Sequence, residues 1–185
     1  AEITIDGSFE DWNSISNLTD PANDDNDLLS DLFELIGMND SDYAGYSVAV
    51  GDVNGDSIDD IILGASAMEG PAGKCADNVG TTSCGGAQVY YSPNSTKTSW
   101  SASPDKELVG MNANDYAGRS LAVGDINGDS IVDVVLGAFY MEGAGDLCAD
   151  GSNLTGCGGA QVYYSPNSTK LDWSTAPDKE VVGMN

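Results

Sequence analysis

The sequence predicts an all-β protein built from tandem, four-stranded, propeller-blade-like repeats. The first observation is an internal repeat: at an offset of 73 residues, 48 of the 73 positions from Ile36 to Leu108 match their partners. The second is that apolar residues within each copy occur in short runs or alternate with polar ones, which is typical of strands. The third is that no stretch inside the copies carries the apolar stripe of a helix. Four short strands with glycine-rich turns are the pattern of a propeller blade.

Four strands are expected in the first copy, and the same four recur in the second. Ser47–Val50 alternates, and Ile61–Leu63 is a β-branched run that predicts a buried strand. Ala87–Tyr91 follows and ends at a Ser-Pro-Asn turn, and Lys106–Val109 is the fourth strand. Outside the copies, Leu28–Ile36 predicts one short helix.

The repeat also predicts the domain organisation. Residues 1–34 match neither copy and are expected to hold a strand, Glu2–Ile5, and an acidic stretch, 20–27, that is either a solvated linker or a further cation site. Repeat 1 covers residues 35–107, repeat 2 covers 108–180, and 181–185 begin a third copy. Repeat arrays usually need three or more units. We therefore expect an open array, part of a larger repeat protein, or an end completed by another chain.

Charge and composition exclude several classes of function. There are 30 acidic residues against 6 basic ones, a formal net charge of −24, which opposes binding to nucleic acid or to an anionic membrane surface. The absence of histidine removes Ser-His-Asp triads and histidine-bound zinc. No apolar run approaches the ~18 residues of a membrane span. We found no constellation of catalytic residues and expect a protein that is not an enzyme.

An aspartate-rich loop is repeated at the same phase of the two copies. The spacing Asp-x-Asn-x-Asp-x-Ile-x-Asp places oxygen ligands at positions 1, 3, 5 and 9, with a main-chain carbonyl at position 7. Ca²⁺ takes six to eight oxygen ligands, and the flanking strands and missing Glu at position 12 distinguish the loop from an EF-hand. The alternative is an Asx-rich hairpin turn without metal. The candidate ligands are Asp52, Asn54, Asp56, Ile58 and Asp60, with Asp125, Asn127, Asp129, Ile131 and Asp133 in the second copy.

Around these loops the sequence resembles the FG-GAP repeat of integrin α-chain β-propellers and of many secreted microbial proteins. The resemblance is carried by Tyr43–Asp56 and Asp60–Ser66, and by Tyr116–Phe139 in the second copy. It implies four-stranded blades with one Ca²⁺ in the loop between the first two strands of each, hence at least two ions per chain, bound by the residues named above.

Cysteines and sequons point to export from the cell. Four cysteines without histidine suit disulfides in an oxidising compartment, and four cysteines allow three pairings. Repeat symmetry favours Cys75–Cys84 and Cys148–Cys157, which would stiffen an insertion in each copy. Among the Asn-x-Ser/Thr sequons, Asn94 and Asn167 occupy the same turn and are the best candidates for glycosylation.

These observations lead to two hypotheses of function. The first is an extracellular, calcium-stabilised structural or adhesive protein that self-associates, as a subunit of a surface assembly or filament. The second is an integrin-like module, a β-propeller that binds a cell-surface or polysaccharide ligand. Near-identical copies favour the first, whereas a closed ring of blades in the full-length protein would favour the second.

Overall fold

The computed structural model describes residues 34–80, 82–143, 147–152 and 156–184. Residues from Leu35 onward belong to one compact unit, Leu35–Asn185. Eight strands and no helix occur in the described part of the chain, which confirms the all-β prediction. The strands are β1 (Ala44–Gly51), β2 (Asp60–Ala65), β3 (Gly86–Tyr90), β4 (Lys106–Val109), β5 (Ser120–Gly124), β6 (Asp133–Ala138), β7 (Gly159–Tyr163) and β8 (Lys179–Val182).

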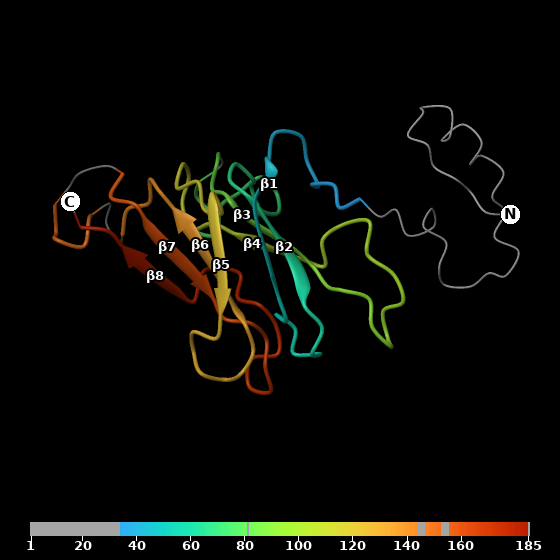
Figure 1. Cartoon of the computed structure of the whole chain (residues 1–185). Coiled ribbons are helices and arrows are strands. Elements are labelled where there is room, and N and C mark those ends of the chain that lie inside the picture. The colour runs from blue at the N-terminus through green and yellow to red at the C-terminus, as the bar shows by residue number, and fades with distance from the viewer. Residues whose placement is uncertain (1–33, 81, 144–146, 153–155, 185) are drawn as a thin grey trace, which may run out of the picture. The chain divides into compact units, whose positions relative to one another are not determined.

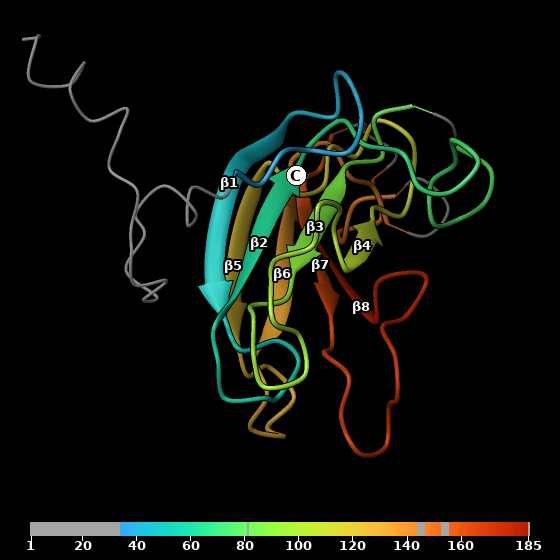
Figure 2. The same cartoon turned by 90° about the vertical axis from the view of Figure 1, so that its right-hand side faces the viewer.

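The strands form two antiparallel sheets of four, in the orders β1-β2-β3-β4 and β5-β6-β7-β8 (Figure 1). Each sheet therefore follows chain order, as a blade formed by a simple meander does. All four strands predicted in repeat 1 are present, and β1 is longer than expected at its start. Figure 2 shows β1 of the first sheet beside β5 of the second.

The fourth strand of each sheet crosses a boundary drawn from the sequence. β4 spans residue 107, and β8 includes Val181 and Val182, which the repeat count assigns to a third copy. In the structure these two valines pair with Ala160 and Gly159 of β7 and so belong to the second sheet. The predicted strand Glu2–Ile5, the acidic stretch 20–27 and most of the predicted helix lie outside the described residues.

The two sheets share one apolar core. Its buried residues come from both repeats and include Ile62 and Val89 of the first sheet and Val134, Leu136 and Tyr163 of the second. Full burial of each such side chain stabilises the fold by about 1.5–3 kcal/mol. A blade buries its inner face only by packing against a neighbouring blade, so the pair is the smallest packed unit visible here.

An insertion between the second and third strand of each sheet is closed by a disulfide. Cys75 bonds to Cys84 and Cys148 bonds to Cys157, as repeat symmetry predicts. Closing so small a loop stabilises it by about 2.7 kcal/mol in the chain-entropy description. A glutamate carboxylate anchors each insertion in addition: Glu69 accepts a hydrogen bond from the backbone N–H of Ser83, and Glu142 accepts one from that of Gly156, each 14 residues along the chain.

Candidate metal centres

The two aspartate-rich loops occupy the same place in the two sheets. The first joins β1 to β2, and Gly51 pairs with Asp60 at the base of the hairpin. The second joins β5 to β6, and Gly124 pairs with Asp133 in the same way. The last aspartate of each loop is therefore the first residue of a central strand, and it is fully buried in both repeats. The hairpin places the first and last predicted ligands of each loop close together.

The first aspartate organises its own loop. One carboxylate oxygen of Asp52 accepts hydrogen bonds from the backbone N–H groups of Gly55 (2.7 Å) and Asp56 (3.1 Å), and the other accepts from Ser57 (2.8 Å). Asn54 and Asp56 each accept from the N–H two residues further on, as in Asx turns. The second loop repeats all of these contacts around Asp125, Asn127 and Asp129.

Two residues in each loop adopt left-handed backbone conformations. Gly55 has φ +78° and Gly128 has φ +80°, as the sequence suggested for a glycine between ligands. Ser57 (φ 70°) and Ser130 (φ 73°) do the same, which sequence reasoning did not anticipate because serine disfavours this region. Only the repetition of serine at this position could have suggested it.

The buried aspartate Asp60 is held by the loop and by a second turn. Its carboxylate accepts from the N–H of Val53 (3.2 Å) and from the N–H of Ser92 (2.9 Å), which follows β3. Burial raises the pKa of Asp60 to about 6 despite these hydrogen bonds, and the charges of Asp56 and Asp52 raise it further. Negative charge is thus concentrated where a cation would relieve it.

The turn after the third strand contacts the loop in both repeats. Asn94 Nδ2 donates to Asp56 Oδ2 at 2.6 Å, and Asn167 Nδ2 donates to Asp129 Oδ2 at 2.6 Å. Sequence reasoning missed this role and assigned the two asparagines to glycosylation, which stays a prediction. The available signal was the unchanged recurrence of the block from Cys84 to Lys97, since a strand and turn alone would tolerate changes.

The two loops also contact each other. The N–H of Val132, at the end of the second loop, donates to the carbonyl oxygen of Asp52 in the first loop (3.2 Å). The side chain of Ile131 lies so close to Gly55 that a Cβ on this glycine would be 3.2 Å from its Cδ1 atom. The two candidate centres are therefore joined by one backbone hydrogen bond.

The donor set fits a hard cation. Each loop offers only oxygen atoms: three carboxylates, one amide and the main-chain carbonyl at Ile58 or Ile131. In the arrangement seen here most of these carboxylate oxygens accept backbone or side-chain hydrogen bonds, and among the described residues no three acidic or cysteine side chains converge on one point. Binding of an ion would therefore require the carboxylates to move toward one another within a loop that is already folded.

Nothing in the part of the chain that the structure describes forms a helix that could cross a membrane.

Comparison with known proteins bears on the same segments. A family model described as the FG-GAP repeat matches residues 44–74 and 117–147, which contain the two loops. Integrin alpha-PS2 of Drosophila melanogaster is 31% identical over 115 residues, 60% of this chain and 8% of that protein. Integrin alpha-V of Gallus gallus is 32% identical over 108 residues, 58% of this chain and 9% of that protein. The chain thus spans less than a tenth of the length of these two relatives.

Proposed function

We propose that this chain, which carries two FG-GAP repeats, is an extracellular, calcium-stabilised protein with a structural or adhesive role. It would act by self-association, as a subunit of a surface assembly or filament. The observation that carries the proposal is the duplicated loop: the same five positions, three of them aspartates, recur in the same hairpin and with the same internal hydrogen bonds in each repeat.

One Ca²⁺ per repeat would be held by the two sets of loop residues. In the first loop these are Asp52, Asn54, Asp56, Asp60 and the carbonyl oxygen of Ile58, with the matching positions in the second loop. When bound, the ion supplies positive charge that offsets three carboxylates. The chain supplies the geometry, because backbone N–H groups orient Asp52, and Asn94 orients Asp56 from outside the loop.

Disulfides support an extracellular location. Each repeat closes its insertion with one, and such bonds persist in oxidising compartments. The similarity to two integrin alpha chains agrees with a cell surface or extracellular setting. Glycosylation at Asn94 and Asn167 belongs to this proposal, although the same amide groups donate to the loop aspartates.

A second candidate function is that of an integrin-like module that binds a cell-surface or polysaccharide ligand. The similarity to integrin alpha chains favours it. In both cases the role is non-enzymatic. A complete ring of blades seen by electron microscopy would favour the binding module, whereas extended assemblies would favour the structural protein.

The calcium proposal is tested by unfolding with and without metal. Binding to the folded state alone raises stability by mass action, so excess chelator should lower the Tm by roughly 10 °C or more and added Ca²⁺ should restore it. Calorimetric titration should give two ions per chain. Asp56→Ala together with Asp129→Ala should abolish binding and reproduce the effect of the chelator.

Asp59→Ala is the matched control, because it removes an exposed aspartate from the same loop at position 8, where the second repeat has Val132. This variant should still bind two ions. An unchanged melting curve in excess chelator would overturn the calcium proposal.

A further inference from the structure

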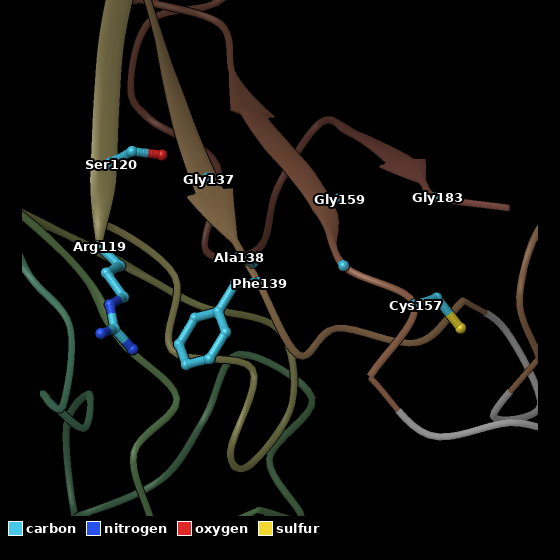
Figure 3. Close-up of a pocket in the computed structure, with 9 residues that line it drawn as sticks. Arg119, Ser120, Gly137, Ala138, Phe139, Cys157, Gly159 and Gly183 are labelled. Carbon is cyan, nitrogen blue, oxygen red and sulfur yellow. The ribbon is translucent and has the colours of Figure 1, made fainter. Parts of the chain in front are cut away.

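A groove of about 680 Å³ opens at one end of the second sheet. Ser120 at the start of β5, Gly137 and Phe139 at the end of β6, and Cys157 and Gly159 at the start of β7 line it (Figure 3). It is distinct from the aspartate-rich loops, which lie at the other end of the same strands.

The same place in the first sheet is filled by the second repeat. The segment Tyr116–Gly118 crosses it, where the N–H of Gly86 donates to the carbonyl oxygen of Ala117 (2.8 Å). The Ser47 hydroxyl donates to the carbonyl oxygen of Gly118 (2.8 Å), and the N–H of Ala117 donates to the carbonyl oxygen of Cys84. This segment is therefore held by backbone and hydroxyl hydrogen bonds on a floor of glycines.

Burial differs between this surface of the first sheet and the groove of the second sheet. Cys84 and Gly86 are buried beneath the second repeat, whereas their counterparts Cys157 and Gly159 are only half-buried. At the position of Phe139, which is 40% exposed, the first repeat has a buried serine. The groove thus corresponds in position to the first repeat's docking surface, and no segment covers it among the described residues.

The segment that would fill this groove has an exposed copy of its own. Tyr43-Ala44-Gly45 is the counterpart of Tyr116-Ala117-Gly118, and the Tyr43 side chain is 64% exposed. Its backbone already has the required form, with φ of 58° at Tyr43 and 88° at Gly45 against 54° at Tyr116 and 81° at Gly118. A preformed segment loses little conformational entropy on docking.

The apolar face beside this segment is unpartnered as well. Val48 and Val50 of β1 are more than half exposed. Their counterparts Leu121 and Val123 on β5 pack against the core shared by the two repeats. Both halves of the interface between the repeats therefore recur, without a partner among the described residues, at opposite ends of the unit.

We infer that Tyr43–Gly45 of one copy of this chain docks into the Cys157–Gly159 groove of a second copy. The contact repeats, between molecules, the interface that joins the two repeats within one molecule. It deepens the self-association in the proposed function and rests on it. Because the two surfaces differ, the contact is head-to-tail and extends into a filament unless the rotation closes a ring.

One feature of the groove must change on docking. In the first sheet the ladder between β2 and β3 ends at the pair of Gly64 and Ala87, which leaves the N–H of Gly86 for the incoming segment. In the second sheet the ladder runs one pair further, to Ala138 and Gly159. Docking in the same register exchanges this terminal pair for the contact with the incoming Ala44.

Two glycine variants block the two surfaces separately. In the single chain a Cβ on Gly45 has no atom within 4 Å, but on its docked counterpart Gly118 it would lie 1.9 Å from the carbonyl oxygen of Gly86. A Cβ on Gly158 would be 3.1 Å from its nearest neighbour, the carbonyl oxygen of Phe139. A Cβ on its counterpart Gly85 would be 2.1 Å from the carbonyl oxygen of Ala117. Gly45→Ala thus blocks the inserting segment, and Gly158→Ala blocks the groove.

The control is Gly73→Ala. Gly73 has φ +65° and no atom within 4 Å of its Cβ position, so the variant carries the same backbone strain away from both surfaces.

Sedimentation equilibrium of the full 185-residue chain in Ca²⁺ and physiological salt, up to about 1 mM protein, tests the inference. The wild type and Gly73→Ala should form species that grow with concentration. Gly45→Ala and Gly158→Ala should each stay monomeric alone, and an equal mixture should form a dimer and nothing larger, because each variant keeps the surface that the other lacks.

A monomeric wild type, or association that survives either variant, would overturn the inference. Melting curves of the same samples with and without chelator report on the calcium proposal independently, so the two can fail separately.

Discussion

The two repeats have nearly the same sequence and different surroundings. Leu108 of the first repeat is fully buried, and its counterpart Val181 in the second is 61% exposed. On the opposite side the order is reversed, since Val50 of β1 is 56% exposed and its counterpart Val123 packs against the shared core. Each repeat thus buries apolar residues on the side where it meets the other repeat and exposes the equivalent residues on the far side.

This contrast shows that the repeat is not the unit of stability. The same position contributes apolar burial in one copy and little in the other, so the interface between neighbours carries much of the free energy of folding, as in other repeat arrays. A pair of equivalent substitutions, one in each repeat, should therefore have unequal effects.

The largest inequality is expected at the glycine of the Tyr-Ala-Gly segment. Gly118→Ala places a methyl group 1.9 Å from the carbonyl oxygen of Gly86, at the centre of the contact between the repeats. It should lower the free energy of unfolding by more than about 3 kcal/mol or prevent folding. Gly45→Ala meets open space and should cost only the strain of its left-handed backbone, about 1–2 kcal/mol. Chemical denaturation of the two variants measures this difference, and equal losses would contradict the role of the interface.

The next inequality concerns the tryptophan before the last strand of each repeat. Trp173 is buried in the shared core, and its Nε1 donates to the hydroxyl of Tyr91 in the first repeat (2.9 Å). Trp173→Ala should cost about 3 kcal/mol of stability, as other truncations of buried aromatic residues do. Trp100, its counterpart, is only half-buried, so Trp100→Ala should cost clearly less. Thermal unfolding of both variants decides the order, and a larger loss at Trp100 would refute it.

The smallest difference in stability between equivalent substitutions is expected to depend on pH. Burial raises the pKa of Asp115 to about 7, and the charges of Glu142 and Glu180 add to the shift. Asp115 Oδ2 accepts from Gln161, and Oδ1 is buried without a partner among the described residues. Because the folded-state pKa lies above the unfolded value, this group stabilises the fold fully below about pH 4, and that contribution is lost as the pH rises through about 7.

Asp115→Asn should remove this dependence and raise stability at pH 8 by roughly 1–2 kcal/mol relative to the wild type. Asp42→Asn is the matched variant in the first repeat, where burial also raises the pKa of Asp42 but Nε2 of the equivalent glutamine, Gln88, is buried without a hydrogen-bond partner among the described residues. Denaturation at pH 5 and pH 8 measures both effects. A pH dependence that persists in Asp115→Asn would exclude this carboxyl as its source.

Local pattern was sufficient for much of the fold. Alternation and β-branched runs predicted all four strands of a repeat, because a strand with one buried face shows its period in the sequence. The cysteine pairs followed from symmetry, since each disulfide closes within one insertion. The spacing of Asp52 to Asp60 identified the candidate loop for the same reason: its candidate ligands lie within nine residues, in one hairpin.

The tertiary structure decided everything that depends on a neighbour. The bond from Asn94 to Asp56 joins residues 38 apart, and no spacing rule connects the end of β3 to the loop before β2. The buried state of Leu108 and the exposed state of Val181 cannot be read from sequences that are nearly the same at the two positions. The sequence by itself determined what each repeat is, because strands, turns and the candidate aspartate-rich loops depend on nearby residues. Only the tertiary structure decided which face of each repeat is covered, because burial belongs to the contact between two repeats.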